Sequence, residues 1–205
     1  MLLCDVGNTS YDFLDNVRHF KENVISFDPR TIKQKVYYIC VNPKVKKILT
    51  SLDNWIDLAS YIDMSPYYET MGIDRIVACE YVQNGIIVDA GSAITVDVVR
   101  DGSFVGGYIY PGVKAMQKSY ANISKALEYE FNYELNLDII PKNSQDAISY
   151  GYLKLLHLEV TSHKMDIILT GGDAKRLASI FPQAKIEEEL LFHSMNKIIK
   201  KARLC

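Results

Sequence analysis

The sequence predicts an α/β protein made of two similar halves, because one short pattern occurs twice. Residues 86–97 contain an apolar run, a bend that includes Asp89, Gly91 and Ser92, and then a β-branched run. Residues 1–9 follow the same order, with an apolar start followed by Asp5-Val6-Gly7-Asn8-Thr9. Each segment is typical of two strands joined by a tight turn. The repetition favours a fold with an internal duplication.

The bends of these two hairpins carry residues suited to binding phosphate. A glycine has no Cβ, so the backbone N–H groups around it can approach an anionic ligand closely. The neighbouring Thr9 and Ser92 add hydroxyl donors. One such turn alone is an ordinary hairpin, but two copies favour a duplicated phosphate clamp.

Composition and charge exclude several classes of protein. The chain has 205 residues, 48% hydrophobic and 23% charged, which fits a folded globular protein. A net charge of −2 gives no basic footprint for nucleic acid, and no apolar run is long enough to cross a membrane. We expect no secretory signal, because the N-terminus begins directly with a strand.

The cysteines and histidines give no pattern for a disulfide or a metal site. The four cysteines, Cys4, Cys40, Cys79 and Cys205, form no C-x-x-C pair. We therefore expect reduced thiols, most of them buried, in a cytoplasmic protein. The histidines have no metal-ligand spacing and are given no chemistry.

The remaining patterns predict alternating strands and helices. They are strands at 11–14 and 36–41, one or two strands within 18–27, helices at 44–49 and 73–82, a strand at 104–110, helices at 113–129 and from Ser144 to Val160, a strand entering a glycine turn at 166–173, and a lysine-rich tail at 185–205. Ser144 fits an N-cap. We expect this tail to form a strand and then a solvated outer helix. The lysines at 44–49 could bind phosphate, but a solvated helix face is the better interpretation.

A loop before the second predicted helix carries residues with two possible roles. Gly72, Asp74 and Arg75 lie at or just before the helix start. Asp74 could be only a helix cap, and Arg75 only a structural ion-pair partner. Alternatively, Asp74 faces a substrate hydroxyl and Arg75 a substrate carboxylate, which the planar guanidinium matches well. The strand and glycine turn at 166–173 leave a similar choice between a plain connection and a ligand-facing edge.

Absent motifs narrow the fold. The sequence contains neither a P-loop pattern nor a Gly-x-Gly-x-x-Gly after a strand. Two strand-rich halves that each begin with a phosphate-binding hairpin point instead to a duplicated ribonuclease-H-like fold. This is the architecture of actin, Hsp70 and sugar kinases, in which ATP lies in the cleft between the halves. We expect residues 1–72 to form the N-terminal half and residues 73–205 the C-terminal half.

The chain resembles the type III pantothenate kinases, which catalyse the first committed step of coenzyme A biosynthesis. The resemblance covers essentially the whole chain through motifs in the family's order. These are Asp5-Val6-Gly7-Asn8-Thr9, Gly72-Ile73-Asp74-Arg75, the run from Asp89 to Asp97, the run from Gly106 to Gly112, the run from Ser144 to Gly151, and the run from Leu169 to Asp173. Each motif alone is moderately specific, and together they are strong.

The resemblance implies an enzyme that phosphorylates the 4′-hydroxyl of pantothenate with ATP. Asp5, Val6, Gly7, Asn8, Thr9 and Ser92 would bind the ATP phosphates. Asp5 would hold Mg²⁺ through water, and Asp89 would hold the potassium or ammonium ion that the family requires. Asp74 would be the catalytic residue, accepting the proton of the hydroxyl or orienting it.

The resemblance also implies how pantothenate and a second subunit take part. Gly72, Ile73, Asp74 and Arg75 would bind pantothenate, and Ser144 would reach the site of the partner subunit in a homodimer. The family has an aromatic substrate contact where this chain has Ser65. Tyr67 or Tyr68 would replace it, and we place Tyr68 in the site.

Other departures and alternatives accompany this assignment. Ser92 and Ser144 stand where the family usually has threonine, but each keeps the hydroxyl. The resemblance also implies that the first half is shortened and that the second half contains the dimer interface. The alternatives are a non-catalytic regulatory protein on the same fold, or another small-molecule kinase of the superfamily. Loss of Asp74 or Arg75 would favour the regulatory role, and both are present.

Overall fold

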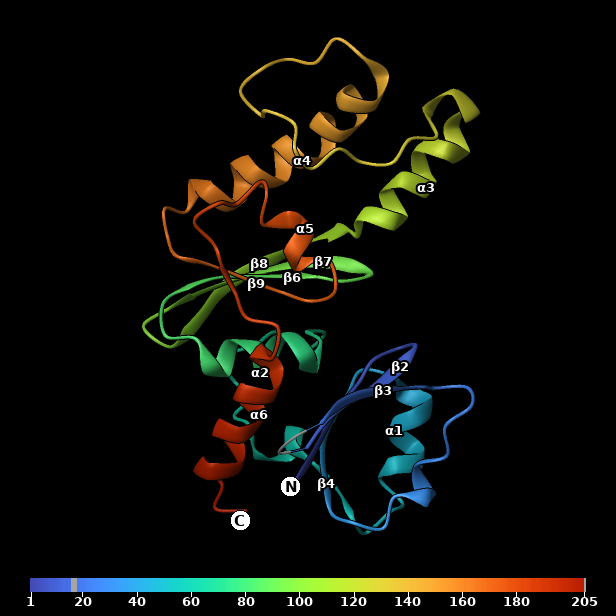
Figure 1. The fold of residues 1–205 in the computed structure, drawn as a ribbon. Coiled ribbons are helices and arrows are strands. Elements are labelled where there is room, and N and C mark those ends of the chain that lie inside the picture. Colours follow the sequence, from blue (N-terminus) through green and yellow to red (C-terminus); the bar gives the residue numbers. More distant parts are fainter. Residues whose placement is uncertain (16–17, 205) are drawn as a thin grey trace. The chain divides into compact units, whose positions relative to one another are not determined.

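The computed structural model describes residues 1–15 and 18–204, which form two compact units (Figure 1). The first unit contains Met1–Tyr81 and the chain from Glu189 onward, and the second contains Val82–Glu188. Each unit is built around one five-stranded sheet.

The first unit has a mixed sheet. Its strands are β1 (Leu2–Val6), β2 (Ser10–Leu14), β3 (His19–Asn23), β4 (Val36–Cys40) and β5 (Trp55–Asp57). They lie in the order β3-β2-β1-β4-β5. The pairs β1–β2 and β2–β3 are antiparallel, whereas β1–β4 and β4–β5 are parallel.

The second unit repeats this arrangement. Its strands are β6 (Gly85–Ala90), β7 (Ala93–Arg100), β8 (Ser103–Pro111), β9 (Ile167–Thr170) and β10 (Lys185–Ile186). The order is β10-β9-β6-β7-β8, with β6–β7 and β7–β8 antiparallel and β6–β9 and β9–β10 parallel. In each unit the first strand therefore pairs with the second and the fourth, in the same directions. The predicted duplicated ribonuclease-H-like fold is confirmed.

The units differ in what connects their third and fourth strands. The first unit has only the short 3₁₀ helix η1 (Pro29–Thr31) there. The second unit has α3 (Val113–Ile123), η3 (Lys125–Leu127) and the long α4 (Ser144–Ser162). The first unit is thus the simpler version of the same design.

The other helices follow the fourth and fifth strands of each sheet. They are α1 (Pro43–Leu49), η2 (Leu58–Tyr61), α2 (Ile73–Tyr81), α5 (Ala174–Leu177) and α6 (Leu190–Lys201). Asn42 caps α1, accepting hydrogen bonds from the N–H groups of Lys44 and Val45, and Pro43 starts the helix. None of the described helices is long and apolar enough to cross a membrane.

The expectation that the lysine-rich tail forms a solvated outer helix is wrong. Along α6, Phe192, Met195, Ile198 and Ile199 are buried in a core that also contains residues of β1, β4 and α2. Only one face carries the lysines, including the exposed Lys200. The helix is amphipathic, and its apolar stripe is packed inside the first unit.

This packing also places the boundary between the two units at a different residue from the one that the sequence predicts. The sequence pattern predicts a boundary between residues 72 and 73, with the tail in the second half. In the structure the boundary follows Tyr81, and the tail returns to the first unit. The reason is that α2 and α6 pack on each other and on the first sheet, and Lys197 Nζ donates a hydrogen bond to the Glu80 carbonyl at 2.7 Å.

The first unit also buries cysteines. Cys4, Cys40 and Cys79 are buried and carry free thiols. Burial raises the pKa of Cys4, and the nearby Asp5 raises it further. Burial also raises the pKa of Cys40, so Cys4 and Cys40 favour the thiol form and pack as small apolar core residues. Cys205 lies outside the described residues.

We predict that Met195→Ala destabilises the protein strongly, because it removes a fully buried side chain and leaves a cavity. The expected loss is about 2–5 kcal/mol in the free energy of unfolding, measured by urea denaturation. Lys200→Ala on the exposed face of the same helix is the control. Equal, small effects of both substitutions would restore the solvated-helix interpretation.

Candidate functional site

The second hairpin is held by its neighbours as well as by its own strands. Within it, the Gly91 N–H donates to the Ala93 carbonyl at 3.0 Å. The Gly112 N–H donates to the Ser92 carbonyl at 3.1 Å, and the Asp173 N–H donates to the Ala90 carbonyl at 2.9 Å. The bend is therefore fixed by the end of β8 and by the turn after β9.

Two positions in these neighbouring segments, Gly112 and Gly171, can only be glycine. Gly171 has φ +85°, and a Cβ on it would lie 2.3 Å from Asp89 Oδ1 and 2.8 Å from the Ala90 nitrogen. A Cβ on Gly112 would lie 2.3 Å from the Ser92 carbonyl oxygen. Both distances are far below van der Waals contact, so the backbone packs directly on the hairpin. This packing sets the position of the half-buried Asp89 carboxylate.

A cavity of about 450 Å³ lies beside this bend. It is lined by Ala90, Gly91, Ser92, Lys114, Ala115, Gly172 and Asp173. The first turn of α3 supplies two of these residues. Its N-cap is Gly112, so no side chain caps the N–H groups at the start of the helix. Helix N-termini and lysines favour anions, so this wall suits a phosphate-bearing ligand.

The first hairpin has a similarly anchored bend. The Gly7 N–H donates to the Ser10 carbonyl at 2.9 Å, and the Val24 N–H donates to the Thr9 carbonyl at 3.0 Å. Asn8 and Thr9 are exposed, and Val6 is buried at the end of β1. The sequence-predicted phosphate residues 5–9 therefore form one turn whose polar side chains reach solvent.

The carboxylate of Asp5 is half-buried at the end of β1 and lies opposite Asp12 of β2 in the strand register. Two acidic residues side by side repel each other. Asp12 is compensated by ion pairs with His19 and with Lys21, whose Nζ lies 2.7 Å from Asp12 Oδ2. Lys21 thus places a positive charge beside this pair of acidic residues.

The Gly72–Arg75 segment forms the start of α2. The helix begins at Ile73, so Asp74 lies inside its first turn. Its Oδ1 accepts a hydrogen bond from the Arg75 N–H at 2.8 Å. A Cβ on Gly72 would lie 2.4 Å from the same Oδ1. Asp74 is thus held by its own helix turn, and Gly72 leaves the room that its carboxylate needs.

Arg75 and Tyr68 form a pair. Arg75 is only 6% exposed, and its Nη1 donates to the Tyr68 hydroxyl at 2.5 Å. Its Cζ lies 5.8 Å from the centre of the Tyr68 ring, within the range of a cation–π contact. Tyr68 is 45% exposed, so the pair consists of a buried arginine and a tyrosine that solvent can reach.

Tyr67 has a different task. Its hydroxyl donates to Glu80 Oε1 at 2.9 Å, which ties the loop to the last turn of α2. Of the two tyrosines, therefore, Tyr68 joins Asp74 and Arg75, while Tyr67 anchors the loop that carries it.

Ser144 is exposed at the first position of α4 and is not its N-cap, contrary to the sequence expectation. The cap is Asn143, whose Oδ1 accepts from the Asp146 N–H at 2.9 Å. Side-chain hydrogen bonds from Asn132 and Asn143 lower the pKa of Asp146. Ser144 does not line the cavity beside the second hairpin.

Sequence reasoning missed Lys114 and Asp173 as residues of the cavity. A usable signal existed for Asp173, because the strand at 166–170 ends in two glycines and an aspartate, a pattern typical of a ligand-facing edge. Lys114 had no such signal. It lies at the cavity because the chain after β8 contacts the hairpin bend and α3 begins at that point.

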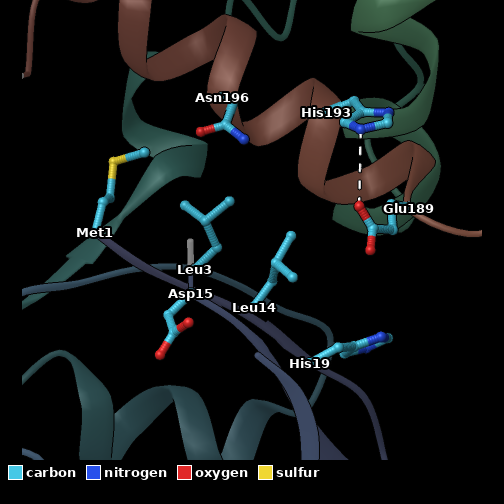
Figure 2. Close-up of a pocket in the computed structure, with 8 residues that line it drawn as sticks. All are labelled: Met1, Leu3, Leu14, Asp15, His19, Glu189, His193 and Asn196. Carbon is cyan, nitrogen blue, oxygen red and sulfur yellow. Dashed lines mark ion pairs between the residues drawn. The ribbon is translucent and has the colours of Figure 1, made fainter. Parts of the chain in front are cut away.

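A second cavity, of about 330 Å³, lies in the first unit (Figure 2). Its lining residues are Met1, Leu3, Leu14, Asp15, His19, Glu189, His193 and Asn196. His193 Nε2 lies 3.8 Å from Glu189 Oε2 in an ion pair. In the part of the chain that the structure describes, no group of three potential ligands is arranged for a metal ion. Leu3 and Leu14 belong to the strands of the first hairpin, but no lining residue lies in the bend of either hairpin.

We predict that Gly171→Ala destabilises the protein by at least about 1 kcal/mol, because alanine resists a positive φ and its Cβ would collide with Asp89. Gly172→Ala is the matched control, since a Cβ there meets nothing within 4 Å. Thermal unfolding of both variants measures the difference. Equal melting temperatures would show that the hairpin does not depend on this approach.

Comparisons with known proteins agree with these motifs. A family model for type III pantothenate kinase matches residues 15–163. A type III pantothenate kinase of Sulfurimonas denitrificans is 58% identical over 205 residues, covering 100% of both chains. One from Campylobacter jejuni is 40% identical, covering 98% of this chain and 97% of its own.

A solved structure extends the likeness to three dimensions. It is a Campylobacter jejuni protein provisionally described as a conserved Baf family transcriptional activator, 38% identical, with a TM-score of 0.91 and 100% coverage of both chains. The family match spans well over half of the chain, and the relatives match it along its whole length. The chain therefore belongs to the type III pantothenate kinase family.

Proposed function

We propose that this protein transfers the γ-phosphoryl group of ATP to the 4′-hydroxyl of pantothenate, giving 4′-phosphopantothenate and ADP in coenzyme A biosynthesis. Family membership supports ATP use and pantothenate as the acceptor. The structural observation that carries the proposal is the cavity at Gly91 and Ser92, with Lys114 in its wall. It offers donors and positive charge where a phosphate chain needs them.

The ATP phosphates are assigned to both hairpins. In the first, Asp5, Val6, Gly7, Asn8 and Thr9 form the turn, and in the second Ser92 supplies a hydroxyl. Phosphoryl transfer requires little covalent chemistry from the protein, so positioning and charge neutralisation dominate. Two anchored turns suit that requirement, because the Thr9 and Ser92 hydroxyls are attached to backbone that is already fixed by hydrogen bonds.

The carboxylates at the two strand ends fit cations that need few protein ligands. Asp5 and Asp89 are each half-buried, and neither belongs to a group of three potential ligands among the described residues. Mg²⁺ keeps several waters and binds through one or two carboxylates plus substrate phosphates. We assign Asp5 to Mg²⁺ through water and Asp89 to a monovalent cation, potassium or ammonium. Bound cations would offset the negative charge of the transferring phosphoryl group.

The acceptor side is assigned to α2 and the loop before it. Arg75, supported by Tyr68, binds the pantothenate carboxylate, and Gly72 and Ile73 line the approach. The oxygen of the pantothenate hydroxyl attacks the γ-phosphorus, and the bond from phosphorus to the ADP oxygen breaks. Asp74 accepts the proton of that hydroxyl, or orients the hydroxyl, during the attack. The loop contact between Tyr67 and Glu80 holds Tyr68 in place for this task.

A homodimer is also part of the proposal, with Ser144 acting in the site of the partner subunit. Ser144 is exposed, as that role requires. The second unit also leaves large apolar side chains accessible on β8 and α4, among them Val105, Ile109, Leu155 and Leu158. Side chains of this kind are suited to burial in a subunit interface.

A regulatory function is the second candidate, because the Campylobacter jejuni structure carries a transcriptional description. A DNA-binding protein usually has a basic surface, and this chain has a net charge of −2. Asp74 and Arg75 are both present, and Asp74 Oδ1 accepts a hydrogen bond from the Arg75 backbone N–H. These observations favour the kinase. We assign it to the cytoplasm, without nucleic-acid or membrane partners, consistent with the three buried free thiols.

We predict that the purified protein phosphorylates pantothenate with Mg·ATP in potassium and loses turnover in sodium. Asp74→Asn should lower kcat at least about 100-fold, because it removes the proton acceptor. Asp53→Asn, an exposed carboxylate of the same unit, is the control and should retain wild-type kcat. The readout is 4′-phosphopantothenate measured by mass spectrometry. A folded dimeric wild type that gives no product with any cation would overturn the proposal.

A further inference from the structure

Asp173 stands at the lip of the cavity beside the second hairpin. It follows β9 and the two glycines of the turn, and its N–H donates to the Ala90 carbonyl at 2.9 Å. The side chain is 17% exposed and contributes to the cavity wall together with Ser92 and Lys114. Its backbone is thus fixed to the same strand end that presents the phosphate donors.

Hydrogen bonds within the protein explain only part of the position of the Asp173 carboxylate. Oδ1 accepts a hydrogen bond from Arg176 Nη1 at 3.0 Å. The side chain makes no capping hydrogen bond to α5, although Asp173 occupies the N-cap position. The half-buried Tyr133 lies near the carboxylate, since burial and then the Asp173 charge raise the pKa of Tyr133 to about 12. Arg176 thus holds one side of a carboxylate that stays partly accessible.

Without a bridging cation, the Asp173 carboxylate would repel the nucleotide phosphates, and the cations are assigned to Asp5 and Asp89. Like charges a few ångströms apart repel strongly in a partly buried site. The cavity thus has a hydroxyl donor at Ser92, positive charge at Lys114, and an anionic acceptor at Asp173. A ligand that fits both parts has phosphates at one end and hydroxyl donors near the other.

A nucleoside triphosphate has this distribution of groups, with the ribose hydroxyls a short distance from the phosphates. Carboxylates that accept hydrogen bonds from ribose hydroxyls are a known solution in nucleotide sites. We propose that Asp173 binds a ribose hydroxyl of the nucleotide, with Arg176 holding the carboxylate in position. This inference rests on the proposed use of ATP and adds a residue that selects ribonucleotides over deoxyribonucleotides.

The test compares ATP, 2′-deoxy-ATP and 3′-deoxy-ATP in equilibrium binding to the full-length protein with Mg²⁺ and without pantothenate. The wild type should bind ATP about tenfold more tightly than at least one deoxy analogue, the size of one hydrogen bond to a charged group. In Asp173→Asn this preference should fall to about twofold or less, since the amide is the weaker acceptor. Asp166→Asn, at the other end of β9, is the matched control and should keep the wild-type preference.

The outcomes separate the alternatives. A wild type that binds all three nucleotides equally would overturn the inference, whatever the variant does. An Asp173→Asn variant that weakens all three nucleotides equally would also overturn it, and would indicate a role in holding Mg²⁺. Ribose selection that depends on Asp173 in a protein that does not phosphorylate pantothenate would uphold this inference and reject the proposed acceptor.

Discussion

The structure depends most on the direct backbone packing around the second hairpin. Gly171 and Gly112 approach Asp89 and Ser92 so closely that no side chain fits between them. This approach joins three segments that are distant in the sequence: the β6–β7 bend, the end of β8 and the turn after β9. The cavity exists because these segments meet, and each brings one kind of group to it. The hairpin brings donors, the start of α3 brings Lys114, and the glycine turn brings Asp173.

The two units share a topology and differ in what they add to it. In both, the first strand ends in an aspartate and a glycine bend next to the fourth strand. The second unit inserts α3 and α4 between its third and fourth strands, and this insertion forms one wall of the cavity. The first unit keeps a single 3₁₀ turn there and instead provides α2, with Asp74 and Arg75 in its first turn. The hairpins are thus common to both units, whereas α3 and α4 belong to the second unit and α2 to the first.

The sequence could predict the features set by local pattern and missed those set by distant contacts. Both hairpins, the strand at 36–41 and the helix start at Ile73 depend on nearby residues, so their patterns were sufficient. The burial of α6 depends on α2 and the first sheet, which the lysine count of the tail concealed. The cap of α4 was misplaced by one residue, because Asn143 and Ser144 are both good N-cap residues and only the hydrogen bond to Asp146 distinguishes them.

Amide hydrogen exchange with and without a non-hydrolysable Mg·ATP analogue tests the duplicated phosphate clamp most directly. If both hairpins bind the phosphates, one equivalent of nucleotide should slow exchange at residues 7–9 and at 91–92 together. The turn at 101–102, at the other end of the second sheet, should not change. Protection of one hairpin alone, or of neither, would contradict the account.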